Sequence, residues 1–183
     1  NNGWGWNDVL PYFLKSENNE MGKSKFHNDG GPIMVSNKKI NLKMLEEFIN
    51  AAEEKGIPRV DDFNTGDNFG VGYYQFTTNY DRGLLKLRCS AAKGYLNPIK
   101  KRKNLKIIVN AHVQKINFES NRAVSINYYI NNELRTVKTN NEIILSAGSI
   151  GSPHILHVSG IGDSEKLKHT GIEVINELKG VGQ

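Results

Sequence analysis

Histidine is the side chain best suited to accept or donate a proton near neutral pH. The sequence contains five: His27, His112, His154, His157 and His169. Two of them, His154 and His157, lie one helical turn apart, a spacing that two ligands of one metal ion can have. No third ligand accompanies the pair, so we interpret both as unliganded and predict no metal site. The only cysteine, Cys89, excludes an internal disulfide and a site built from several thiolates.

Glycine pairs are a second pattern with chemical meaning, because a Gly-x-Gly-x-x-Gly turn after a strand is the usual cradle for a dinucleotide pyrophosphate. Such pairs occur at Gly3/Gly5, Gly70/Gly72, Gly160/Gly162 and Gly180/Gly182. None has the third glycine, and none leads from a convincing strand into a helix at the required spacing. We therefore predict that no pyrophosphate cradle is present in this chain.

A turn of small residues offers another kind of contact with an anionic ligand. Residues 142–146 are typical of a short strand buried on both faces, and residues 146–149 are all small. Ser152 as N-cap and Pro153 at the first helical position then predict a helix that Gly160 ends. Such an arrangement brings backbone N–H groups toward an anion, although many α/β proteins have it without any ligand.

The elements that must position these residues are short helices and strands in mixed order. Apolar spacing and capping residues predict helices over 7–16, 41–56, 90–98, 153–159 and 163–170. Runs of β-favouring residues predict strands over 33–35, 73–78, 105–109, 142–146 and 172–175. Alternating residues predict an antiparallel meander over 113–119, 123–130 and 134–139. The predicted fold class is α/β, of mixed α+β type.

Composition is that of an ordinary globular protein: 183 residues, 38% hydrophobic and 23% charged. That length allows one large domain or parts of two. No apolar run approaches the roughly 20 residues that a transmembrane helix needs. Much of the net charge of +5 lies in Lys100–Lys103. We interpret this cluster as a solvated turn and predict no nucleic-acid partner, because no aromatic residues are interleaved with the charges.

Several motifs resemble the glucose–methanol–choline (GMC) oxidoreductases, flavoenzymes that use FAD to oxidise alcohols. The run from Ser146 to Gly162, SAGSIGSPHILHVSGIG, is similar to the second signature of that family. Four further stretches resemble family segments in family order: NGWGWNDVLPYF, DDFN, RCSAA and GVG. The resemblance covers essentially the whole chain and is nearest to the bacterial choline and aliphatic-alcohol dehydrogenases.

The resemblance implies that the chain is an internal piece of such an enzyme. FAD would be the cofactor, and choline or another primary alcohol would be oxidised to the aldehyde by hydride transfer to the flavin. The catalytic histidine of the family lies downstream of the matched segments, so none of the five histidines corresponds to it and we predict no catalytic residue here. We expect the isolated chain to be inactive.

The resemblance also implies which residues lie against FAD. Val113 matches the position whose backbone contacts the adenine in relatives. Ser146, Ala147 and Gly148 match the turn that lies against the dinucleotide, where only small residues let cofactor and backbone approach closely. Residues 88–91 match a run that we interpret as support for a domain junction.

The implied organisation has three parts: residues 1–31 as a lid or connecting segment, 32–87 as part of the substrate-binding domain, and 88–183 as part of a Rossmann-like FAD-binding domain with the meander. An alternative is a stand-alone binding module that uses its basic patch. A fragment would expose apolar faces and self-associate, whereas a module would be a sealed monomer. The resemblance to the bacterial branch implies a cytoplasmic or membrane-associated enzyme.

Overall fold

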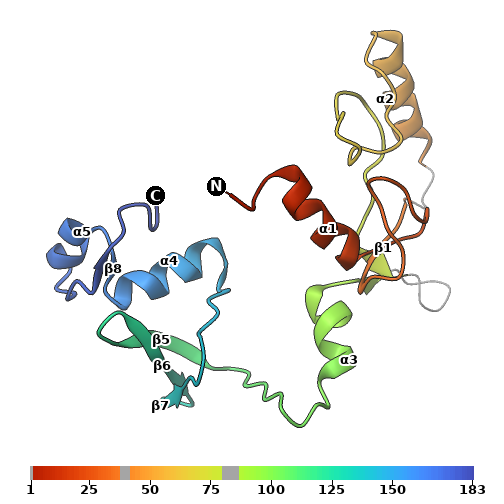
Figure 1. Cartoon of the computed structure of the whole chain (residues 1–183). Coiled ribbons are helices and arrows are strands. Elements are labelled where there is room, and N and C mark those ends of the chain that lie inside the picture. Colours follow the sequence, from red (N-terminus) through yellow and green to blue (C-terminus); the bar gives the residue numbers. More distant parts are fainter. Residues whose placement is uncertain (1, 38–41, 80–86) are drawn as a thin grey trace. The chain divides into compact units, whose positions relative to one another are not determined.

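The computed structural model describes residues 2–37, 42–79 and 87–183, and the chain divides into two compact units (Figure 1). The first unit is Asn1–Lys106 and the second is Ile107–Gln183. Each combines helices with short strands, which confirms the mixed α/β prediction. The boundaries predicted after residue 31 and after residue 87 separate parts with different expected roles. These boundaries stay predictions. Among the described residues, no helix is long and apolar enough to cross a bilayer.

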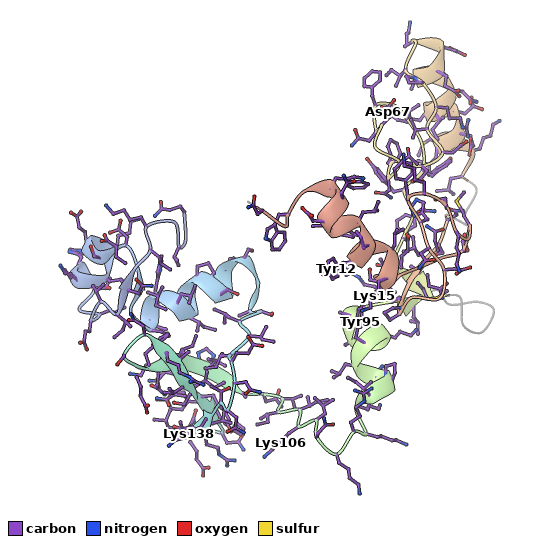
Figure 2. All side chains as sticks on the ribbon, in the orientation of Figure 1. Tyr12, Lys15, Asp67, Tyr95, Lys106 and Lys138 are labelled. Carbon is purple, nitrogen blue, oxygen red and sulfur yellow. The ribbon has the colours of Figure 1, made fainter. Side chains whose placement is uncertain are left out.

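The first unit opens with helix α1 (Trp6–Ser16), which confirms the helix predicted over 7–16. The Asp8 carboxylate accepts a hydrogen bond from the Gly5 N–H at 3.0 Å and so satisfies one of the free donors at the helix start. The chain then runs directly into β1 (Glu17–Asn19), which pairs in parallel with β2 (Ile33–Val35). Large side chains on α1 remain exposed, Tyr12 among them (Figure 2).

Helix α2 (Lys43–Glu54) confirms the helix predicted over 41–56. Ile49 is the buried residue of this helix. Gly56, with a φ of 82°, takes the left-handed conformation that ends it. The following loop is tied back to the helix, because the Arg59 guanidinium lies 2.9 Å from the Glu46 carboxylate.

The end of the first unit departs from two predictions. The strand predicted over 73–78 is reduced to β3 (Thr78–Asn79), which pairs with β4 (Leu87–Arg88). Among the described residues, its earlier part forms one isolated bridge, between Phe76 and Ser36, and no continuous ladder. The helix predicted over 90–98 is present, but as a π-helical stretch η1 (Ala92–Leu96) followed by α3 (Asn97–Ile99).

Cys89 lies at the junction of these elements and is only 4% exposed. Its sulfur accepts a hydrogen bond from the Met34 N–H at 3.4 Å and lies 3.7 Å from the Pro32 carbonyl oxygen. Gly94 also packs here, because a Cβ at that position would lie 2.5 Å from the same Pro32 oxygen. Beyond this junction, Lys100–Lys103 lie exposed around a turn.

The second unit is built on the predicted meander: β5 (His112–Glu119), β6 (Arg122–Ile130) and β7 (Glu133–Lys138). The order β5-β6-β7 is antiparallel throughout, which confirms the meander. Asn131 and Asn132 connect β6 to β7 with φ values of 50° and 64°. Two successive positive φ values are the signature of a tight hairpin turn that asparagine tolerates well.

Helix α4 (Gly148–Val158) packs against β5. The Ser159 hydroxyl joins the two elements, because it accepts a hydrogen bond from the Ile116 N–H at 2.8 Å. Helix α5 (Ser164–His169) confirms the helix predicted over 163–170 and is capped by Asp163.

The strand predictions over 105–109, 142–146 and 172–175 are wrong in detail. The last strand is β9 (Asn176–Glu177), beside β8 (Ile161–Gly162), and lies just after the predicted 172–175. Residues 105–109 and 142–146 form no strand, and Val109 and Ile144 are 70% and 80% exposed. Within the described ranges no strand lies beside either segment, and an extended segment becomes a strand only when a partner satisfies its backbone groups.

Candidate functional site

The turn predicted to lie against a dinucleotide is open to solvent. Ser146, Ala147 and Gly148 are all exposed at the start of α4. Ala147 has φ −88° and ψ 11°, and Gly148 has a φ of 84°, so neither residue has the backbone angles of a regular helix. A Cβ at Gly148 would meet no atom within 4 Å. Within the described part of the second unit, no bulky side chain covers the backbone of this turn at Gly148.

Helix α4 begins five residues earlier than the sequence suggests, at Gly148 instead of Pro153. Ser152 is not its N-cap; its hydroxyl reaches back and accepts a hydrogen bond from the Ala147 N–H at 3.0 Å. Pro153 consequently lies inside the helix. The hydroxyl thus fixes the small-residue turn, a role that the N-cap interpretation missed.

Val113 lies on β5, opposite Tyr128 of β6, and is partly buried. The pairing shifts between Val113 and Lys115, so the strand has a bulge next to this position. Since α4 packs against β5, Val113 and the turn at 146–148 belong to one compact unit. Their contact with FAD stays a prediction.

His154 and His157 have separate surroundings. His154 is exposed, whereas the Nε2 of His157 lies 3.1 Å from the Val181 carbonyl oxygen. A Cβ at Gly162 would lie 2.6 Å from the His157 ring, and one at Gly182 would lie 2.9 Å from it. Because neither glycine has a side chain, both leave space for the His157 ring. Among the described residues, no group of three His, Cys, Asp or Glu side chains could hold a metal ion.

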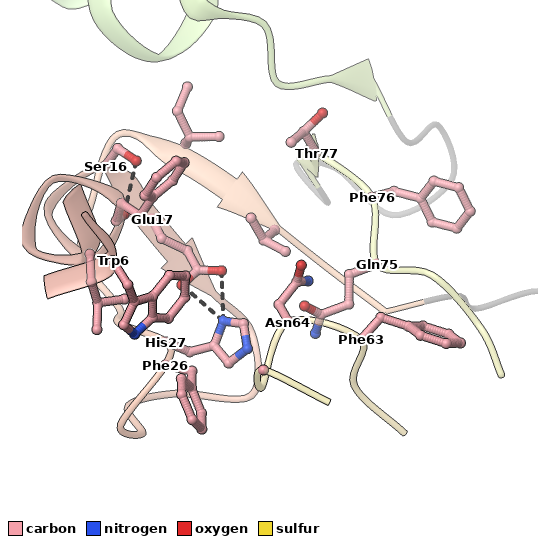
Figure 3. Close-up of a pocket in the computed structure, with 15 residues that line it drawn as sticks. Trp6, Ser16, Glu17, Phe26, His27, Phe63, Asn64, Gln75, Phe76 and Thr77 are labelled. Carbon is pink, nitrogen blue, oxygen red and sulfur yellow. Dashed lines mark hydrogen bonds and ion pairs between the residues drawn. The ribbon is translucent and has the colours of Figure 1, made fainter. Parts of the chain in front are cut away.

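A cluster of one histidine and two carboxylates lies in the first unit, where no candidate site was predicted from the sequence. The His27 ring is 10% exposed and the side chains of Glu17 and Asp62 are each 16% exposed. Nδ1 of His27 lies 2.9 and 3.0 Å from the two Glu17 carboxylate oxygens (Figure 3). Nε2 lies 2.7 Å from the Asp62 carboxylate. Strand β1, residues 24–30 and residues 61–66 therefore meet at one imidazole.

Both ring nitrogens of His27 face carboxylate oxygens, so the charged imidazolium, with a proton on each, satisfies both contacts. Burial works against that charge, but hydrogen bonds and the charges of Glu17 and Asp62 outweigh it and raise the pKa of His27 above its usual 6.5. Asn19 Nδ2 lies 3.1 Å from Nδ1 of His27. The amide could donate a hydrogen bond to Nδ1 only if Nδ1 had lost its proton. The surroundings of the ring therefore favour its charged form.

A cavity of about 540 Å³ borders this cluster, within the range of ligand pockets. Five aromatic residues line it: Trp6, Phe13, Phe26, Phe63 and Phe76. Figure 3 shows Trp6 and Phe26 beside His27. The polar corner of the cavity is formed by Glu17 and His27, with the amides of Asn64 and Gln75 nearby. The pocket thus combines a wide aromatic wall with a single charged corner.

Sequence reasoning missed this cluster because its members are far apart along the chain. His27 appeared only as one of five histidines, and Glu17 lay in a polar run with no motif. Asp62 lies in the DDFN segment, which resembled a family motif but had no assigned role. That segment was the one available signal. The partner of Asp62 lies 35 residues away, and no local pattern encodes such a pairing.

The whole chain is similar to proteins of one family. A family model described as GMC oxidoreductase matches residues 1–183. The oxygen-dependent choline dehydrogenase of Pectobacterium atrosepticum is 36% identical over 181 residues, which are 98% of this chain and 32% of that protein. Human mitochondrial choline dehydrogenase is 37% identical, over 99% of this chain and 30% of its own length.

A solved structure is similar as well. An FAD-dependent oxidoreductase from Chaetomium thermophilum matches with a TM-score of 0.91 and 32% identity, over 100% of this chain and 33% of that one. The chain thus spans about a third of the length of the relatives that it matches.

Proposed function

Because this chain belongs to the GMC oxidoreductase family, we propose that it is part of an enzyme that oxidises a primary alcohol to the aldehyde, with choline as the first candidate. The observation that carries the proposal is the match of the family over the whole chain, residues 1–183. FAD is the cofactor that the family and its solved relative indicate, and when bound it supplies the hydride acceptor. Choline comes from the names of the two dehydrogenases.

The second unit would supply contacts to the adenosine part of FAD. The open turn at Ser146–Gly148 fits this role, because its side chains are small and exposed and a Cβ at Gly148 would meet no neighbouring atom. The hydrogen bond from the Ala147 N–H to the Ser152 hydroxyl holds the turn in place without a ligand. Val113 would add a backbone contact from β5. These residues would bind and orient the cofactor.

The first unit would supply part of the substrate side, over residues 32–87, with 1–31 as a connecting segment. No residue of this chain corresponds to the catalytic base of the family, so the isolated chain would not turn over. A cytoplasmic or membrane-associated location stays a prediction.

Flavin reduction tests the function directly. We expect the enzyme that carries this chain, purified with FAD and mixed anaerobically with choline, to lose the visible absorbance of oxidised flavin. We expect the isolated 183-residue chain to show no such loss under the same conditions. A holoenzyme that is reduced by no primary alcohol would refute the proposed reaction, and an isolated chain that bleaches would refute its inactivity.

Two glycine variants test the cofactor contact. Gly148 and Gly171 have φ values of 84° and 73°, and an added Cβ meets nothing within 4 Å at either position. Valine therefore imposes the same backbone strain at both. Gly148→Val is expected to weaken FAD binding by about tenfold or more, which corresponds to about 1.4 kcal/mol, whereas Gly171→Val leaves it unchanged. Equal losses in the two variants would show that strain, and not contact at the turn, is responsible.

A further inference from the structure

We propose that His27 is a proton-dependent link between β1 and residues 61–66. With a proton on each ring nitrogen it donates to Glu17 and Asp62 at once. Loss of one proton breaks one of these two contacts and loosens the polar corner of the aromatic pocket.

The geometry makes the link dependent on charge. A neutral imidazole has one N–H and one lone pair, so one carboxylate would face a lone pair at a distance of 2.7 to 3.0 Å. Asn19 could then donate to Nδ1, but both Glu17 oxygens would still face that nitrogen. One of the two contacts must therefore lengthen when the ring loses a proton.

The charged groups around the ring come from three segments. Glu17 faces it from β1 and Asp62 from the loop. On the segment of His27 itself, Lys23 pairs with Asp29 at 3.2 Å, and Lys25 lies 5.4 Å from the centre of the Phe26 ring. Each of these two lysines thus has a partner outside the cluster.

The protonation state of His27 also determines the charge beside the pocket. While His27 is charged, each carboxylate oxygen has a donor: the Asn28 N–H and Asn19 amide also serve Glu17, and the Asn64 N–H serves Asp62. With one imidazolium between two carboxylates, the linked cluster carries a formal net charge of −1 beside the aromatic wall of the pocket. After deprotonation no positive charge remains in the cluster, and its formal net charge becomes −2.

The sign of the pH effect follows from the raised pKa of His27. The stabilisation is complete below the ordinary pKa of histidine, and it disappears as the pH rises through the higher value of the folded protein. The corner is therefore linked below the raised pKa of His27 and loosens as the pH rises through it.

Nuclear magnetic resonance of the 183-residue chain tests the proposal. The His27 ring signals should titrate above the usual histidine range. The hydrogen-exchange rate of the Asn64 N–H, corrected for the intrinsic rate at each pH, should increase about tenfold with the same midpoint. Loss of one charge-assisted hydrogen bond implies a change of this size. If the His27 ring of the unmodified chain titrates at or below the usual histidine value, the proposal is wrong.

Amide variants distinguish a proton-dependent link from simple packing. In both Asp62→Asn and Glu17→Gln, the new amide can donate to the deprotonated ring nitrogen, so a neutral His27 satisfies both neighbours. Each variant should lower the midpoint by about one pH unit or more and remove the increase in Asn64 exchange that accompanies deprotonation. Asp29→Asn, at the exposed Lys23 pair, should leave the midpoint unchanged. If neither amide variant moves the midpoint, the proposal is wrong.

Discussion

Replacing Gly162 with alanine should destabilise the second unit by forcing the ring of His157 out of its place. The added Cβ would lie 2.6 Å from Cδ2 and 3.0 Å from Nε2 of that ring. Gly162 is not among the residues with positive φ, so the alanine brings no backbone strain of its own. The whole effect should therefore come from the contact between the new methyl group and the imidazole.

The expected cost has two parts. Overpacking of a buried contact typically costs about 1–3 kcal/mol. A displaced ring also loses the 3.1 Å hydrogen bond between Nε2 and the Val181 carbonyl oxygen, worth about 1 kcal/mol. Together these effects predict a loss of about 2–4 kcal/mol in the free energy of unfolding, a large part of the stability of a typical domain.

Urea denaturation of four proteins in a double-mutant cycle measures this coupling: the unmodified chain, Gly162→Ala, His157→Ala and the double variant. Once the ring is absent, Gly162→Ala should cost nothing or stabilise by up to about 1 kcal/mol, because alanine restricts the unfolded chain. If Gly162→Ala costs the same in both backgrounds, the ring of His157 is not the group that requires a glycine here.

Three further predictions concern the turn, a helix cap and the exposed apolar residues. Gly148→Ala should lower the free energy of unfolding by about 1 kcal/mol, because its φ of 84° is unfavourable for alanine; urea denaturation would show no loss if the turn relaxes. Backbone N–H groups, that of Lys166 first, lower the pKa of Asp163, so Asp163→Ala should destabilise the chain at neutral pH. The difference should vanish as the pH falls through the folded-state pKa, and a constant difference in acid would contradict the cap. Ile144 and Ile150 are 80% and 85% exposed, so the chain should self-associate in light scattering, and serine at both positions should reduce its apparent mass.

The sequence predicts best where a single segment determines its own structure. The helices over 7–16 and 41–56 follow from local apolar spacing, and the meander follows from alternation and two tight turns. The strands predicted over 105–109 and 142–146 fail because a strand needs partners, and the described chain places none beside them. Ile107, Ile108, Val109 and Ile144 therefore remain exposed.

The candidate site also combines features that local sequence predicts with features that depend on distant segments. The small residues at 146–148 could be recognised from their types, whereas the helix start could not, because the Ser152 hydroxyl bonds back to Ala147 and does not cap at its own position. The ion pairs of His27 depend on three segments folding together, and only the structure reveals them.

The burial of Cys89 gives the chain an intrinsic reporter. It is the only thiol in the sequence, and with 4% of its surface exposed it is shielded from reagents in the folded state. A maleimide or disulfide reagent can react with it only after β2 and the segment before η1 separate. Labelling kinetics would therefore time the local opening of the first unit alone, without an engineered probe.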